Sequence, residues 1–284
     1  MHHITAFGPL AQRYDGFILD LWGVIHDGVT PYPGAPGCLR ALRDAGKRVV
    51  LLSNAPRRAH VAARALQAMG LDDSLYTGIM TSGEATFLAL QNAAADPWFA
   101  RLGRRVFHLG PERDRNVIEG LPLTRVDSPG EADFVVNTGP DDLGSQTDIA
   151  DFFGVLEACH AASLPMICAN PDLEVIRGGT RVICAGALAQ HYAELGGDVR
   201  WLGKPDPAIY APVLAMLGVE RSKVLAVGDA LRTDIAGADS VGIDSCWVLG
   251  GIHGEELGHD PVRIDAAAAA AGLEPVACIA AFSW

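Results

Sequence analysis

The chain of 284 residues is 49% hydrophobic and 20% charged, which is the composition of a folded globular protein and excludes a disordered one. Its length is sufficient for two compact units, each with its own core. The formal net charge of -12 disfavours nucleic acid and anionic membrane surfaces as partners, because both attract basic proteins.

The six cysteines are scattered along the chain without a Cys-x-x-Cys pair, and several lie inside apolar runs. This pattern predicts buried free thiols in a reducing compartment, and neither a disulfide framework nor a zinc site. The N-terminus shows no secretory signal, and no apolar stretch reaches the roughly 20 residues that a membrane span needs. We therefore expect a cytoplasmic protein.

Strand and helix patterns alternate through the first ~80 residues, as expected of parallel βαβ units. Each expected strand is a short apolar run, which is typical of a strand buried on both faces of a parallel sheet. The expected strands are 16–19, 49–54 and one that ends near Thr81, and the expected helices are 36–44, 57–69 and one that starts at Ser82.

The middle of the chain, from residue 83 to residue 199, has an alternation of its own that predicts a separate α/β unit with its own sheet. The expected strands are 106–109, 134–137 and 166–169, and the expected helices are 148–162 and 185–195.

The pattern of the first unit resumes near Leu202. Asp206 and Pro207 suit the N-cap and first position of a helix, whereas Pro212 would kink that helix or delay its start. Further expected elements are strands at 224–228 and 242–249, a helix at 265–271, and turns at Gly178-Gly179 and Gly250-Gly251.

Carboxylates stand at two places where buried strands end. Asp20 follows the first strand, Asp229 follows the strand at 224–228, and Asp234 comes five residues later at the start of an expected helix. An isolated aspartate at a strand end is usually a turn cap. Paired carboxylates, however, suit Mg²⁺, which proteins hold with one or two carboxylates together with substrate phosphates.

Three further polar residues suit phosphate oxygens. Ser53 offers a hydroxyl, Asn54 an amide, and Lys204 an ammonium between a glycine and a proline. Each has a simpler interpretation, since Ser-Asn is ordinary turn chemistry and a lysine in a turn is more often solvated. The four segments together, in this order, indicate a site for Mg²⁺ and phosphate much more specifically than any one of them does.

In that order the segments resemble the haloacid dehalogenase superfamily of phosphohydrolases, in particular class IIA, the NagD-like phosphatase group. The resemblance covers almost the whole chain. Its motifs are Asp20-Leu21-Trp22-Gly23-Val24 for the nucleophile, Ser53-Asn54, Gly203-Lys204-Pro205, Gly228-Asp229 with Thr233-Asp234 for the metal, and Ala169-Asn170-Pro171-Asp172 in the cap.

The resemblance implies a Rossmann-like parallel-sheet core, residues 1–82 and 200–284, and an inserted α/β cap domain, residues 83–199. It also implies a Mg²⁺-dependent phosphohydrolase that acts on a small phosphorylated metabolite through an aspartyl-phosphate. Asp20 would be the nucleophile and Lys204 the catalytic cation. The implied metal ligands are Asp20, Asp229, the carbonyl of Trp22 and, through water, Asp234, and the implied phosphate-binding residues are Ser53, Asn54 and Lys204.

Trp22 departs from the family pattern, which has a second aspartate two positions after the nucleophile. An indole cannot serve as an acid or base near neutral pH, and loss of such a group typically costs ~10²–10⁴ in rate. His26 and Asp27 are candidates to replace it, although ordinary turn residues are the simpler interpretation. Asn170 and Asp172 are expected in a cap loop that faces the core, with turn formation as the alternative.

Two other functions remain compatible with the sequence. One is a dehalogenase-type hydrolase, whose leaving group needs no proton. The other is a non-catalytic protein that binds phosphorylated metabolites and has lost turnover. The sequence does not specify the substrate, and a homo-oligomer is left open.

Overall fold

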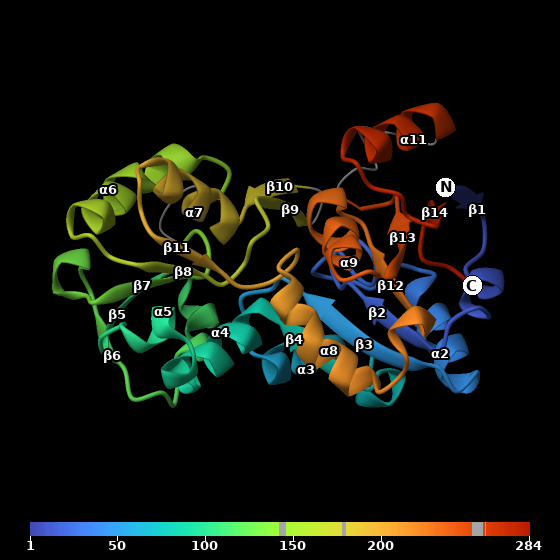
Figure 1. The fold of residues 1–284 in the computed structure, drawn as a ribbon, viewed down its shortest axis with the longest axis horizontal. Helices are drawn as coiled ribbons and strands as arrows, with labels where there is room; N and C mark the ends of the chain where they lie inside the picture. The colour runs from blue at the N-terminus through green and yellow to red at the C-terminus, as the bar shows by residue number, and fades with distance from the viewer. Residues whose placement is uncertain (142–145, 178–179, 252–257, 259) are drawn as a thin grey trace.

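The computed structural model contains two parallel sheets that lie side by side along the long axis of the molecule, each covered by helices on both faces (Figure 1). It describes residues 1–284 except 142–145, 178–179, 252–257 and 259, so the turn expected at Gly178-Gly179 lies outside the described residues. The α/β class expected from the sequence, a Rossmann-like parallel-sheet core with a further α/β part, is confirmed.

The first sheet has seven strands, and every pair of neighbours runs parallel. Its central strands are largely apolar because both of their faces are buried. In the second strand, for example, Phe17 and Leu19 pack into the core on one face, whereas Ile18 packs into the core on the other. The order across the sheet is β1 (His2–Ile4), β14 (Ala277–Ile279), β13 (Asp244–Val248), β12 (Val224–Gly228), β2 (Gly16–Leu19), β3 (Arg48–Ser53) and β4 (Gly78–Thr81).

Helices cover both faces of this sheet. One face packs against α1 (Gly8–Ala11), α2 (Ala35–Asp44) and α3 (Ala59–Ala68). The other packs against α8 (Tyr210–Leu217), α9 (Ala236–Ser240) and α11 (Pro261–Ala270).

The second sheet has five parallel strands and uses residues from 105 to 201 only. Its order is β11 (Val199–Trp201), β8 (Met166–Cys168), β7 (Phe134–Asn137), β5 (Arg105–Leu109) and β6 (Thr124–Val126). The helices α6 (Phe153–Ala161) and α7 (Ala185–Glu194) cover one face, and α4 (Ser82–Gln91) and α5 (Pro97–Ala100) cover the other.

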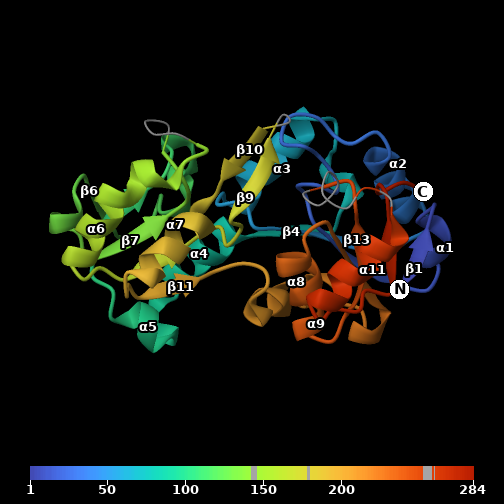
Figure 2. The same cartoon turned by 90° about the horizontal axis from the view of Figure 1, so that it is seen from above.

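A two-stranded antiparallel hairpin, β9 (Glu174–Arg177) and β10 (Thr180–Ile183), lies between the two sheets (Figure 2). It leaves the second sheet after β8 and returns to it at α7. Because the hairpin is placed between the two parts, its side chains can face the carboxyl ends of the first sheet's strands.

Most expected elements are present, with informative differences at their ends. Pro212 is the third residue of α8, in the first turn, where a missing N–H is not needed. It therefore delays the helix without kinking it, and Asp206 caps a separate short turn before it. The short 3₁₀-helical turns of the described chain are η1 (Asp73–Leu75), η2 (Ala93–Ala95), η3 (Glu112–Val117), η4 (Pro129–Glu131), η5 (Ile149–Phe152), η6 (Pro207–Ile209) and η7 (Arg221–Lys223).

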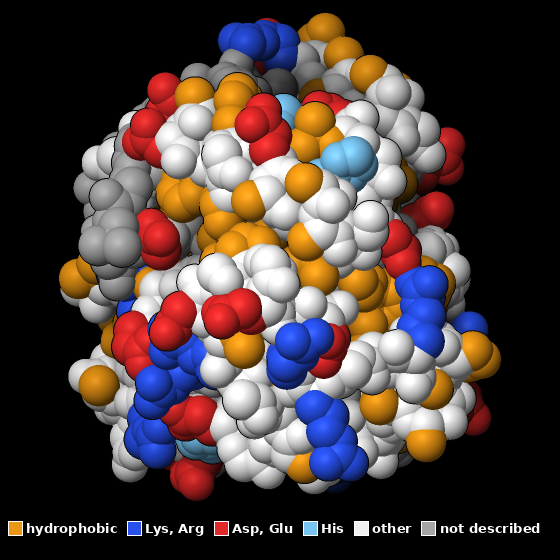
Figure 3. Space-filling model, turned by 90° about the vertical axis from the view of Figure 1, so that its left-hand side faces the viewer, with side chains coloured by type: hydrophobic (Ala, Val, Ile, Leu, Met, Phe, Trp, Pro, Cys, Tyr) orange, Lys and Arg blue, Asp and Glu red, His pale blue; other side chains and the backbone are white. Residues whose placement is uncertain are grey.

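Strands β1, β6, β11 and β14 and the hairpin were not expected from the sequence. These strands are only three or four residues long, too short to show a period. Acidic and basic side chains are interspersed on the end of the molecule that carries the second sheet (Figure 3). Within the described part of the chain, no helix is both long and apolar enough to cross a membrane.

Candidate functional site

Polar residues meet at the carboxyl edge of the first sheet. Strands β12, β2 and β3 are neighbours there, and Asp229, Asp20 and Ser53 stand at or just after their carboxyl ends. Since the strands are parallel, these residues share one edge, which is where open α/β sheets bind ligands. Lys204 reaches the same edge from the loop that follows β11.

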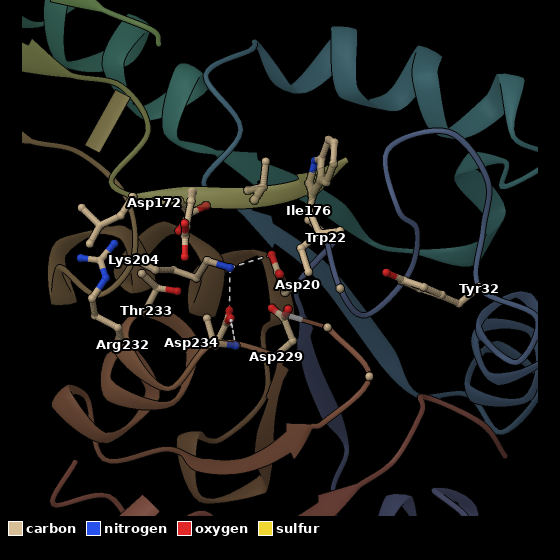
Figure 4. Close-up of a pocket in the computed structure, with 17 residues that line it drawn as sticks. Asp20, Trp22, Tyr32, Asp172, Ile176, Lys204, Asp229, Arg232, Thr233 and Asp234 are labelled. Carbon is tan, nitrogen blue, oxygen red and sulfur yellow. Dashed lines mark hydrogen bonds and ion pairs between the residues drawn. The ribbon is translucent and has the colours of Figure 1, made fainter. Parts of the chain in front are cut away.

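Lys204 is at the centre of a buried charge cluster. Its Nζ lies 2.7 Å from Oδ1 of Asp20 and 2.6 Å from Oδ1 of Asp234 (Figure 4). One carboxylate oxygen from each of Asp20, Asp229 and Asp234 lies within 4.8 Å of the other two. Three buried carboxylates therefore face one ammonium, which leaves the cluster with an excess of negative charge.

The pKa values of Asp20 and Lys204 reflect this excess of negative charge. Burial raises the pKa of Asp20 well above its usual range, Lys204 opposes that change, and Asp234 and Asp229 add to it. Burial alone would lower the pKa of Lys204, but the carboxylates of Asp20, Asp234 and Asp172 raise it well above its usual value. The lysine stays charged, and the remaining carboxylates form a set of hard oxygen donors that fits Mg²⁺ in both chemistry and charge.

Two glycines leave room for the Asp229 carboxylate. A Cβ added at Gly23 would lie 2.1 Å from Oδ2 of Asp229, and one added at Gly251 would lie 1.8 Å from the same atom. Real Cβ atoms do not approach so closely, so any side chain at either position would displace the carboxylate. Gly250-Gly251, expected only as a turn, therefore also forms part of the wall of the site.

A π-helical turn, η8 (Leu231–Ile235), turns Asp234 towards the lysine. The N–H of Ala230 donates to Oδ2 of Asp234 at 3.1 Å, which leaves Oδ1 for Lys204. Gly228 permits this arrangement, since a Cβ there would lie 2.1 Å from the Asp234 side chain. Single π turns are rare and often mark functional sites.

Asn54, which the sequence suggested as a phosphate ligand, makes its hydrogen bonds to protein groups in the structure. Its Nδ2 donates to Oδ1 of Asp172 at 2.9 Å and to the carbonyl of Lys204 at 3.1 Å. Its Oδ1 accepts from the N–H of Lys204 at 2.8 Å and from the hydroxyl of Ser82 at 3.2 Å. These bonds use both amide donors and two acceptor positions. Asn54 thus joins the lysine loop to the segment that follows β8.

Ser53 is buried at the end of β3, and its hydroxyl accepts from the N–H of Ala55 at 3.2 Å. Among the described residues, neither Ser53 nor Asn54 lines the cavity that contains Asp20.

The charge cluster opens into a cavity of about 250 Å³ that is covered by β9, the first strand of the hairpin. Val175 and Ile176 of β9 line it from above, and Asp172 lines it from the preceding loop (Figure 4). Burial raises the pKa of the Asp172 carboxyl, against lowering by Lys204 and Asn54. Arg232 donates to the carbonyl of Pro171, which ties this loop to the first sheet.

Trp22 forms one wall of the cavity, in the loop after β2. Its indole packs closely over the backbone of Gly28, where a Cβ would lie 2.1 Å from the indole Cη2. His26 meets the indole edge to face, with ring centroids 5.5 Å apart. The position of the tryptophan is therefore fixed by its own loop.

His26 and Asp27 are not brought to the Asp20 cavity within the described structure. His26 is buried, and its Nδ1 accepts from the N–H of Gly28 at 2.9 Å. Burial lowers the pKa of His26 to about 4. Oδ1 of Asp27 accepts from the N–H groups of Val29 and Thr30, which closes a turn. These hydrogen bonds also lower the pKa of Asp27. Both residues therefore build the loop that holds Trp22.

Asn170 also forms a turn, since its Oδ1 accepts from the N–H of Asp172 at 3.0 Å. Asp172, by contrast, faces the core through its bond to Asn54. Other residues that line the cavity were not singled out by the sequence, because their positions depend on loops and on the hairpin; they include Tyr32, Val175, Ile176 and Arg232.

Comparison with known proteins supports the family resemblance that the sequence motifs indicate. Residues 17–124 match the haloacid dehalogenase-like hydrolase family model, and residues 201–274 match a second model described as HAD-hydrolase-like. The crystal structure of a haloacid dehalogenase-like hydrolase from Brucella suis 1330 is 32% identical, with a TM-score of 0.83 over 98% of this chain and 99% of that one.

Two further relatives carry names that describe an activity. D-glycerol 3-phosphate phosphatase of Mycobacterium tuberculosis is 29% identical over 89% of this chain and 69% of its own length. The crystal structure of a glycerol phosphate phosphatase from that organism in complex with magnesium is 27% identical, with a TM-score of 0.65 over 92% of this chain and 75% of that one. The chain belongs to the haloacid dehalogenase-like hydrolases, in the class IIA group.

Proposed function

We propose that this hydrolase is a Mg²⁺-dependent phosphatase that releases phosphate from a small phosphorylated metabolite through an aspartyl-phosphate. The observation that carries the proposal is the buried cluster of Asp20, Asp229 and Asp234 around Lys204 in the wall of a cavity. The phosphatase names of the relatives support the same activity.

Asp20 is the nucleophile in this proposal. Its carboxylate oxygen forms a bond to phosphorus while the bond from phosphorus to the ester oxygen breaks, and the alcohol leaves with a proton. Water then attacks phosphorus and releases phosphate and the free carboxylate. Lys204 holds Asp20 in place and offers its charge to the phosphoryl oxygens.

Asp20, Asp229, Asp234 and the carbonyl of Trp22 would hold the metal, directly or through water. Bound Mg²⁺ supplies positive charge that offsets the carboxylates and the phosphoryl oxygens. Residues 83–199 would act as the cap domain that closes over residues 1–82 and 200–284, with the hairpin excluding water from the reacting groups.

Asp172 is the best placed residue to give the leaving group its proton. It lines the cavity, whereas His26 and Asp27 do not among the described residues. Burial raises its pKa, which favours the protonated form that a general acid needs. In this proposal the cap supplies the acid that Trp22 cannot supply.

A binding protein without turnover is the second candidate, and Trp22 is the observation that favours it. A dehalogenase-type activity is less well supported, because the clustered carboxylates suit a metal and a phosphate. The six buried free cysteines support a location in the cytoplasm, where thiols stay reduced.

The deciding experiment is a screen of phosphorylated metabolites and p-nitrophenyl phosphate with the purified protein, with Mg²⁺ and with a chelator. We expect Mg²⁺-dependent release of phosphate from a small number of substrates. Tight binding of a phosphorylated metabolite without any release would instead support the binding protein.

A further inference from the structure

A second cavity, of about 120 Å³, lies next to the Asp20 cavity, between the first sheet and the cap. Trp22, Asp172 and Val175 line both cavities, so the two spaces share a wall. The second cavity is bounded by residues 55–57 from the loop after β3 and by both strands of the hairpin.

The charges of the two cavities are opposite. The first carries five carboxylates against the cations of Lys204 and Arg232. The second carries the guanidinium groups of Arg57, Arg113 and Arg177 against two carboxylates. Three arginines thus surround one small cavity in a chain whose net charge is -12.

The carboxylates of the second cavity are already engaged. Asp114 is buried and pairs with Nε of Arg57 at 2.9 Å. Asp172 accepts from Asn54 and lies near Lys204. Arg177 has no ion-pair partner among the described residues, so this cavity can offer at least one cation to an anion.

A tryptophan at position 22 is compatible with an anion bound in the second cavity. It occupies the shared wall, where the family pattern has an aspartate. An aspartate at position 22 would add a second carboxylate, beside Asp172, to the wall and would repel an anionic substrate that extends over both cavities, whereas a neutral indole does not. Because Gly28 and His26 fix the indole, it also gives both cavities a rigid apolar side.

We propose that the second cavity binds the leaving group of the substrate and selects one that carries an anion, a carboxylate or a second phosphate. This inference rests on the proposed phosphatase function. The phosphoryl group would lie at Asp20 and Lys204, the middle of the substrate against Trp22 and Val175, and the distal anion at Arg177 and Arg113. The substrate class is thus a phosphate monoester of an acidic alcohol.

The test compares matched substrates that differ in one charge: ethyl phosphate with 2-phosphoglycolate, and glycerol phosphate with 3-phosphoglycerate. We expect kcat/KM for the acidic member to exceed that of its neutral partner by at least tenfold in one pair. Arg177→Gln and the double variant Arg113→Gln/Arg177→Gln should lower kcat/KM for the acid about 10–100-fold, the range for a charged hydrogen bond, mainly through KM. The neutral member should change little.

Arg101→Gln is the matched control, because Arg101 is an exposed arginine of the same part of the chain that lines neither cavity. Neutral substrates hydrolysed as well as acidic ones would overturn the inference and leave the phosphatase function intact. Equal losses on both members of a pair would also overturn it. Absence of hydrolysis of every substrate, p-nitrophenyl phosphate included, would reject the phosphatase function and this inference with it.

Discussion

Asp20 has two roles at the level of a single side chain, as the proposed nucleophile and as an ion-pair partner of Lys204. An asparagine has nearly the same shape and still offers an oxygen to the lysine. It is neither a nucleophile nor an anionic metal ligand, so the substitution separates chemistry from folding.

We expect Asp20→Asn to abolish phosphate release and to leave the fold intact. Phosphate release on the best substrate of the native protein measures the first effect, and circular dichroism with thermal unfolding measures the second. Retention of most of the activity by a folded variant would rule out the aspartyl-phosphate.

Asp172→Asn tests the source of the proton. The amide keeps an oxygen for Asn54 but cannot donate the proton of a carboxylic acid. We expect kcat for an alkyl phosphate to fall about 10²–10⁴-fold, the usual value of general acid catalysis, and kcat for p-nitrophenyl phosphate to fall much less, because nitrophenolate leaves without a proton.

The double variant Trp22→Asp/Asp172→Asn should regain part of the alkyl phosphate activity, because Trp22→Asp restores a carboxylate in the wall of the cavity. The gain is limited by the space that loss of the indole leaves. Similar losses on both substrates in Asp172→Asn would show that Asp172 only holds the cap loop in place.

At the level of elements, Gly251, in the segment that follows β13, lies directly against the proposed metal site. A Cβ at Gly251 would meet the Asp229 carboxylate, whereas one at Gly154, near the start of α6, would have nothing within 4 Å. Gly251→Ala should therefore weaken Mg²⁺-dependent activity strongly, and Gly154→Ala should not. Metal titrations of activity compare the two. Equal Mg²⁺ dependence in both variants would contradict the close contact with Asp229.

The sequence predicted the residues of the charge cluster well, because the carboxyl ends of parallel strands necessarily share an edge. Asp20 and Asp229 follow strands that are apolar without interruption, so the sequence shows their burial directly. The role of Asn54 could not be predicted, because its partners lie 28 to 150 residues away along the chain. The sequence did not predict the hairpin for a similar reason. Strands β9 and β10 lie over the site, and each strand is only partly buried.

At the level of the whole molecule, metal binding should couple to stability. A ligand that binds only the native state raises the free energy of unfolding by about 2.7 kcal/mol at a concentration of 100 Kd. Mg²⁺ would also relieve the repulsion among Asp20, Asp229 and Asp234. We therefore expect Mg²⁺ to raise the Tm of the native protein.

Asp229→Ala should remove most of that increase in Tm. Asp239→Ala makes the same change in charge at an exposed position of α9 and should preserve it. Differential scanning fluorimetry with and without Mg²⁺ compares the three proteins. An undiminished Mg²⁺ response in Asp229→Ala would place the metal elsewhere.

The order of strands in the first sheet has a consequence for the way the chain folds as it is made. Strand β2 pairs with β12, which is synthesised only after the whole second sheet is complete. Until then β2, β3 and β4 form an incomplete sheet whose apolar edge at β2 is open, which is the kind of edge that promotes aggregation. The second sheet, built from one continuous stretch, can fold on the ribosome before the final third of the chain completes the sheet edge that carries Asp20 and Asp229.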